Sequence, residues 1–144
     1  VDIVFVTHEH GDHHTGLDAF PHARWVAAPG VAEAIGRAHP RERVIESTAG
    51  TLAEGIEIVP TPGHTPNHHR LVFRDADGMR VAIAGDAVMT RDFWKNKQGF
   101  FNSADFDLAA ATIERLTAMA DVIVPGHDNY FLTRPRLPEH RAPA

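Results

Sequence analysis

Seven side chains of the kinds that bind metal ions follow four segments of this chain that are predicted to be β-strands. Four of them lie in one short run, residues 8–13, directly after the apolar segment 1–6. Each of the other three follows a later strand-like run. Because imidazole and carboxylate groups are the natural ligands of zinc and similar metals, the fold is expected to bring these strand ends together. The residues are His8, His10, Asp12, His13, His64, Asp86 and His127.

The number and spacing of these groups point to more than one ion. Seven ligands are too many for one tetrahedral ion, and they suit two ions that share a bridging ligand. His8 and His10 point the same way on an extended segment and can meet one ion. His13 breaks this alternation, so the chain must turn there and can offer Asp12 and His13 to a second ion. A glycine directly before each later ligand lets the backbone approach closely.

Apolar periodicity predicts a mixture of strands and helices. We predict strands over residues 1–6, 24–28, 43–46, 56–60, 70–74, 80–84 and 121–124. We predict helices over residues 15–20, 31–38 and 105–120. The last is the clearest, because its apolar side chains, among them Phe106 and Ile113, recur on one face. Residues 75–78 predict a hairpin turn, and residues 87–104 a long aromatic and basic loop.

Composition limits the classes of function. The apolar fraction of 43% suits a globular domain, and a net charge of -5 without a Lys/Arg block gives no indication of an extended nucleic-acid surface. The absence of cysteine excludes disulfides, thiolate metal sites and a cysteine nucleophile. Neither a signal peptide nor an apolar run near the ~20 residues that span a bilayer is visible. We therefore expect a cytoplasmic protein that acts on a small molecule without a membrane, with a dimer as one option for its oligomeric state.

Four motifs together resemble the metallo-β-lactamase superfamily. They are the run His8-x-His10-x-Asp12-His13, the segment Thr61–Pro66, Gly85-Asp86 and Pro125-Gly126-His127. The resemblance covers residues 1 to about 130 and implies a mixed α/β (α+β) fold, an αββα sandwich with its site at one edge between the sheets. Members usually carry further strands before the first histidine motif. We therefore expect a partial domain over residues 1–134, with its first N-terminal strands missing, and a loose Pro-rich tail over residues 135–144.

The resemblance also implies roles for the seven ligands. His8, His10 and His64 would bind a first metal, and Asp12, His13 and His127 a second, with Asp86 bridging both. Two divalent ions are implied, with zinc expected and iron or manganese as alternatives. Such a site activates a hydroxide against an ester, thioester, lactone or phosphodiester. Asp12 would also be catalytic, by orienting that hydroxide.

The segment 91–102 is the best candidate for a wall of the substrate site, because it begins close to the last carboxylate ligand. Its cationic side chains would meet an anionic group, and its aromatic side chains an apolar one. The alternative is a loop packed for structure or against another subunit. A second histidine after the Thr61–Pro66 segment and a tyrosine after the last histidine ligand are further candidates. The predicted substrate contacts are His68, Arg91, Trp94, Lys95 and Tyr130.

Two other functions fit the same motifs. Persulfide dioxygenases share this histidine pattern and use a single iron, so an oxidoreductase is one alternative to a hydrolase. A metal-binding domain without catalytic activity is the other. The identity and the number of the bound metal ions would separate these possibilities.

Overall fold

Two β-sheets form the frame of the structure, a computed structural model that describes residues 1–39 and 45–134. The smaller sheet has three parallel strands in the order β1-β2-β3. β1 consists only of apolar residues, as is usual for strands of parallel sheets that are covered on both faces. The strands are β1 (Ile3–Val6), β2 (Arg24–Ala27) and β3 (Glu46–Ser47).

The larger sheet has six strands in the order β4-β5-β6-β7-β8-β9. Neighbouring strands are antiparallel except for β7 and β8, which run parallel. Gly85 at the end of β7 lies opposite Pro125 at the end of β8, so the residues that follow these strands emerge at the same edge. The strands are β4 (Gly50–Ala53), β5 (Ile56–Pro60), β6 (His69–Arg74), β7 (Arg80–Gly85), β8 (Val122–Pro125) and β9 (Phe131–Leu132).

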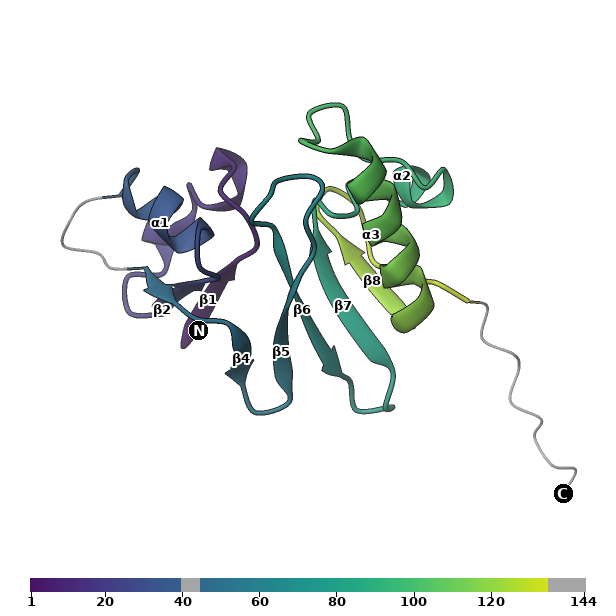
Figure 1. The fold of residues 1–144 in the computed structure, drawn as a ribbon. Helices are drawn as coiled ribbons and strands as arrows, with labels where there is room; N and C mark the ends of the chain where they lie inside the picture. The colour runs from purple at the N-terminus through teal and green to yellow at the C-terminus, as the bar shows by residue number, and fades with distance from the viewer. Residues whose placement is uncertain (40–44, 135–144) are drawn as a thin grey trace, which may run out of the picture.

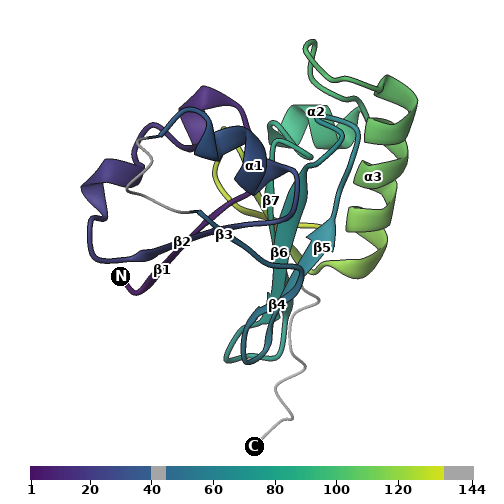
Figure 2. The same ribbon diagram turned by 60° about the vertical axis from the view of Figure 1, so that its left-hand side comes forward.

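Helices cover the two sheets from opposite sides. Figure 1 shows α3 lying across β7 and β8, and Figure 2 shows the sheets between α1 on one side and α3 on the other. This is the predicted αββα sandwich. The helices are α1 (Val31–Gly36), α2 (Arg91–Lys95) and α3 (Phe106–Met119), with 3-10 turns at Gly11–His13 and Leu17–Ala19. Within residues 1–39 and 45–134, no helix is long and apolar enough to cross a membrane.

Each sheet has its own apolar core, and the two cores share no residue. The smaller sheet packs with α1 around Trp25 and Ile35, and the larger sheet packs with α3 around Ile113 and Ile123. All four side chains are at most 2% exposed. Burial of a side chain of this size contributes roughly 1.5–3 kcal/mol. The loops at the edge between the sheets are therefore held by two independently packed halves.

Most predicted elements are confirmed, with ends that differ by a few residues. The first half of the predicted strand 43–46 lies outside the described residues, Ile45 lies in no strand, and Glu46 begins β3. The predicted helix over residues 15–20 is only the short 3-10 turn Leu17–Ala19. Phe106, predicted on the buried face of a helix, is 52% exposed, because the buried face of α3 begins one turn later at Ala109. The predicted tail 135–144 lies outside the described residues.

Three elements were not predicted. β4 is largely exposed, and β9 has only two residues, so neither has a clear apolar pattern. Residues 87–104, predicted as a loop, contain the helix α2. Its signal is Thr90, whose side chain accepts a hydrogen bond from the Phe93 backbone N–H at the start of the helix, followed by Asp92 in the first turn.

Replacing Gly63 by Ala tests how closely the loop before His64 packs on α3. An added Cβ would lie 2.5 Å from the Cα of Ala109, and the φ of +135° is rare for residues other than glycine. We expect Gly63→Ala to lower the free energy of unfolding by about 2 kcal/mol or more, measured by urea denaturation.

Gly16→Ala is the matched control, because an added Cβ there meets nothing within 4 Å. We expect it to change the free energy of unfolding by less than about 0.5 kcal/mol. Equal stabilities of the two variants would contradict the close contact between Gly63 and α3.

Candidate metal centre

The predicted ligands all follow strands and converge between the two sheets. Those of the histidine run follow β1 in the smaller sheet, and the later three follow β5, β7 and β8 in the larger sheet. In Figure 1 the loop after β1 lies beside the loop that joins β5 to β6. Within each of two adjacent groups, the ligand atoms lie within 4.8 Å of one another. The groups are His8, His10, His64 and Asp86, and Asp12, His13 and His127.

The first group is a buried cluster of three imidazole nitrogens and one carboxylate oxygen. The Nε2 atoms of His8 and His64 lie 3.1 and 3.0 Å from Nδ1 of His10. They lie 3.7 and 3.3 Å from Oδ2 of Asp86. A neutral imidazole has one N–H and one lone pair, so three converging nitrogens cannot all be satisfied by hydrogen bonds to one another. A cation at their centre would accept the lone pairs.

The second group is more exposed and meets the other oxygen of Asp86. Oδ1 of Asp86 lies 3.2 Å from Nε2 of His13 and 3.4 Å from Nε2 of His127. Oδ2 of Asp12 lies 3.6 and 3.4 Å from the same two nitrogens. The carboxylate of Asp86 therefore presents one oxygen to each group. The side chains of Asp12 and His127 are 60% and 44% exposed, so the second group faces solvent.

These distances suit divalent metal ions. Four ligands at about 2.0–2.1 Å from a tetrahedral zinc ion are about 3.3 Å apart. The imidazole nitrogens around Asp86 lie 3.2–3.7 Å from its oxygens. Nε2 of His13 and Oδ1 of Asp86 are buried and lack a well-formed hydrogen bond within the described part of the chain. An ion bound between such atoms would remove the cost of leaving them unpaired, and nitrogen and oxygen donors fit zinc, iron or manganese.

Burial and the charge of Asp86 set the protonation of the cluster. Burial lowers the pKa of His8 to about 3, so its lone pair is free at neutral pH. Burial alone would raise the pKa of Asp86, but contacts with His13 and His64 outweigh it and hold this pKa well below its usual range. Contact with the Asp86 carboxylate raises the pKa of His13. A permanent negative charge among these imidazoles favours a bound cation.

Polar side chains beside the ligands hold them in place. The hydroxyl of Thr7 lies 3.1 Å from Nδ1 of His8, which leaves Nε2 of that ring directed into the cluster. The hydroxyl of Thr65 donates a hydrogen bond of 3.1 Å to Glu9 and so ties the histidine run to the loop of His64. Glu9 was not predicted as part of the site. The signal that points to it is its position inside the histidine run.

A cavity of about 400 Å³ opens onto both ligand groups. Its volume lies within the range of small-molecule sites. Four ligands line it, namely His10, Asp12, Asp86 and His127. The remaining lining residues are Met89, Thr90, Phe93, Phe100 and Asn102, and the last three belong to the segment 91–102 that was predicted as a wall.

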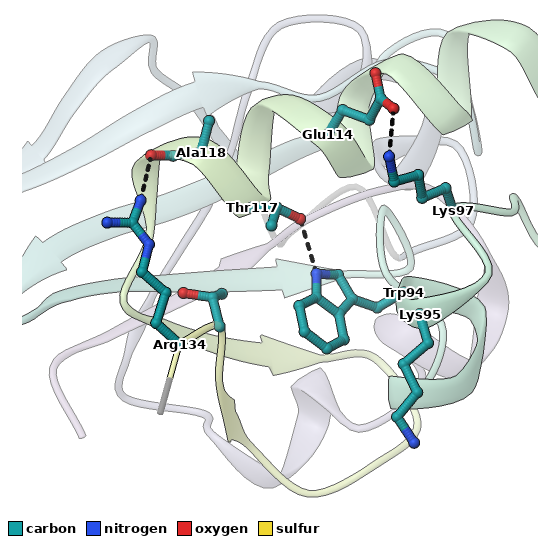
Figure 3. A pocket seen from close by; sticks show the side chains of 8 residues that line it. Trp94, Lys95, Lys97, Glu114, Thr117, Ala118 and Arg134 are labelled. Carbon is teal, nitrogen blue, oxygen red and sulfur yellow. Dashed lines mark hydrogen bonds and ion pairs between the residues drawn. The ribbon is translucent and has the colours of Figure 1, made fainter. Parts of the chain in front are cut away.

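Four of the predicted substrate contacts line other cavities. Trp94 and Lys95 line a cavity of about 560 Å³ between α2 and α3 (Figure 3). Arg91 and Tyr130 line a neighbouring cavity of about 520 Å³, and among the described lining residues neither cavity includes a predicted ligand. Successive helical residues point about 100° apart, so α2 directs Phe93 to the ligands and Trp94 away from them. The role of these four residues in substrate binding stays a prediction.

His68, the fifth predicted contact, lies beneath the first ligand group. It is 0% exposed, and its ring centroid is 5.0 Å from that of His8. Its Nδ1 lies 2.8 Å from the Thr61 hydroxyl, and its Nε2 accepts a hydrogen bond from the Ala87 backbone N–H at 3.3 Å. Burial holds the pKa of His68 well below its usual value. This position suits a neutral support for the ring of His8, and contact with a substrate stays a prediction.

Replacing Gly126 by Ala tests the placement of the Asp86 carboxylate. An added Cβ would lie 1.9 Å from Oδ1 of Asp86, so the carboxylate must move away from His13 and His127. We expect Gly126→Ala to weaken zinc binding about ten-fold or more, measured by isothermal titration calorimetry. Gly11→Ala is the matched control, because its added Cβ meets nothing within 4 Å. Unchanged zinc affinity in both variants would contradict a metal-binding role for this carboxylate.

Comparison with known proteins identifies relatives over most of the chain. The Metallo-beta-lactamase superfamily matches residues 1–127. An N-acyl homoserine lactonase of a Bacillus species is 28% identical, over 88% of this chain and 56% of that protein. The probable metallo-hydrolase YflN of Bacillus subtilis is 32% identical, over 78% of this chain and 50% of that protein. The chain thus spans about half the length of the curated relatives it matches.

A solved structure shares the fold. The dizinc quorum-quenching lactonase AidC, in complex with a product, matches with a TM-score of 0.72 at 16% identity. The match covers 96% of this chain and 62% of that chain. The sandwich fold, the histidine and aspartate clusters at its edge and the sequence match over residues 1–127 agree, and the chain belongs to the metallo-β-lactamase superfamily.

Proposed function

We propose that this chain forms the metal-binding part of a hydrolase that uses two zinc ions. The observation that carries the proposal is the carboxylate of Asp86, whose two oxygens face two different groups of ligands. A carboxylate in this position is suited to bridge two ions. The group around His8 and His64 would hold the first ion, and the group around His13 and His127 the second.

The relatives support a hydrolase and a pair of zinc ions. One relative is named as a lactonase, another as a probable metallo-hydrolase, and AidC as a dizinc lactonase. These names favour an ester or lactone bond as the substrate of this chain. The proposal also covers thioesters and phosphodiesters, because a hydroxide activated by two metal ions can attack each of these bonds.

The chain's own residues would position the reactants. Two bound divalent ions supply an activated water and polarise the substrate oxygen. Asp12, exposed beside the cavity, is placed to bind metal and to accept a hydrogen bond from the attacking water. Hydrolysis adds the OH of water to the acyl carbon or phosphorus, and the remaining proton leaves with the departing oxygen or sulfur.

Replacing Asp86 by Ala tests the bridging role. We expect Asp86→Ala to lose bound zinc and hydrolysis together, because both ligand groups lose an oxygen at 3.2–3.7 Å from their nitrogens. Elemental analysis of the purified protein measures the zinc content, and a panel of ester, lactone, thioester and phosphodiester substrates measures turnover.

The control is Asp18→Asn, an exposed carboxylate in the 3-10 turn Leu17–Ala19, which should keep both zinc content and turnover. Full activity with two zinc ions still bound in Asp86→Ala would contradict the assignment. One bound iron in the native protein, with oxygen consumed on a persulfide, would favour a dioxygenase instead. Two metals without any turnover would favour a binding domain.

A further inference from the structure

Three phenylalanines form an apolar wall beside the metal centre. The ring centroid of Phe93 lies 5.3 Å from that of Phe100 and 5.7 Å from that of Phe101, and Phe100 and Phe101 are 5.2 Å apart. Phe93 and Phe100 are half-buried and line the cavity of the ligands, together with Met89. Phe101 is 74% exposed at its edge. We call these three phenylalanines the aromatic wall.

Backbone hydrogen bonds fix the aromatic wall relative to the ligands. The backbone N–H groups of Ala104 and Asp105 donate to the carbonyls of His64 and Gly63, each at 3.0 Å. The backbone N–H of Ser103 donates to the carbonyl of Phe100 at 2.8 Å and closes the turn that carries this ring. The same loop that holds a ligand histidine therefore also holds the wall, so the wall stands in a defined place before any substrate binds.

Close packing at Gly99 holds the other end of this loop. An added Cβ at Gly99 would lie 2.8 Å from the Cβ of Ala109 and 2.9 Å from Oγ of Ser103. The loop therefore lies directly on α3, and the wall is part of the packed structure. A preformed apolar surface binds a ligand without the entropic cost of ordering it.

The cations of this region point away from the cavity. Lys97 pairs with Glu114 at 3.0 Å on the face shown in Figure 3, and Lys95 pairs with Asp92 at 3.4 Å. The guanidinium of Arg91 lies over the Phe131 ring. Among the described residues that line the metal cavity there is no Lys or Arg. An anionic group far from the metals would therefore meet aromatic rings and no opposite charge.

We propose that the aromatic wall binds an uncharged aliphatic acyl chain of the substrate, with the carbonyl of the scissile bond at the metals. The inference rests on the proposed function and narrows it to esters or lactones of apolar acids. Group carriers with several negative charges are disfavoured, because the wall offers no partner for those charges.

Binding of simple carboxylates to the zinc-loaded full chain tests the wall without turnover. Butanoate, hexanoate and octanoate share a carboxylate that the metals would bind and differ only in chain length. We expect calorimetry to show affinity rising by up to about four-fold for each CH₂ that the wall covers. Octanedioate, with a second charge at its far end, should bind roughly ten-fold more weakly than octanoate.

Variants of the aromatic wall test whether the dependence of affinity on chain length arises there. Phe93→Ala and Phe100→Ala should reduce the ratio of octanoate to butanoate affinity, and Phe100→Leu, which keeps an apolar side chain, should restore most of it. Phe106→Ala is the matched control, because Phe106 is 52% exposed and does not line the cavity. If an alanine variant fails to fold, Phe93→Leu and Phe100→Leu, which keep apolar side chains but remove the rings, provide the comparison.

Each outcome separates the two proposals. Equal affinity for all chain lengths, or octanedioate binding as tightly as octanoate, would overturn the aromatic wall and leave the metal centre standing. No binding of any carboxylate to zinc-loaded protein would overturn the wall together with the proposed function. Rising affinity that the wall variants do not change would place the acyl chain elsewhere and overturn this assignment.

Discussion

A carboxylate buried among imidazoles is the interaction on which this structure depends. Asp86 is 5% exposed, and its two oxygens lie between 3.2 and 3.7 Å from four histidine nitrogens. A buried charge is costly unless it is paired, and hydrogen bonds from imidazole N–H groups offset only part of that cost. Metal ions on both sides of the carboxylate would complete the balance. The end of β7 and the close approach of Gly126 keep this one side chain where both ligand groups can reach it.

The order of the strands explains how such an arrangement arises from one chain. Asp86 and His127 follow β7 and β8, which are parallel neighbours, so their side chains meet at one edge by topology alone. The histidine run follows a strand of the other sheet, so contacts between the two sheets must hold it beside Asp86 and His127. The backbone N–H of His69 donates to the Thr7 carbonyl at 2.9 Å, which joins the end of β1 to the start of β6.

The separate strands and the turn after the histidine run could be predicted because they follow local rules, whereas the sandwich fold and the grouping of the ligands were implied by the resemblance to the metallo-β-lactamase superfamily. Apolar runs such as Ile3–Val6 mark strands, and the histidine spacing marks the turn that follows. The segment 91–102 could be predicted as a wall, but which of its side chains face the cavity could not, because this depends on how α2 is rotated about its axis. Phe93 and Trp94 are neighbours in sequence and equally aromatic, yet only the first lines the metal cavity. That choice is made by packing, since the indole N–H of Trp94 donates to the Thr117 hydroxyl on α3.

The two apolar cores share no residue, so the ligand cluster can also connect the two halves of the fold. His8 and His10 belong to one half of the sandwich, whereas His64, Asp86 and His127 belong to the other. An ion held by both sets would cross-link the two halves, as a disulfide does in a protein that has cysteines, and would add to the hydrogen bond between His69 and Thr7. Removal of that ion would leave fewer connections between the two halves.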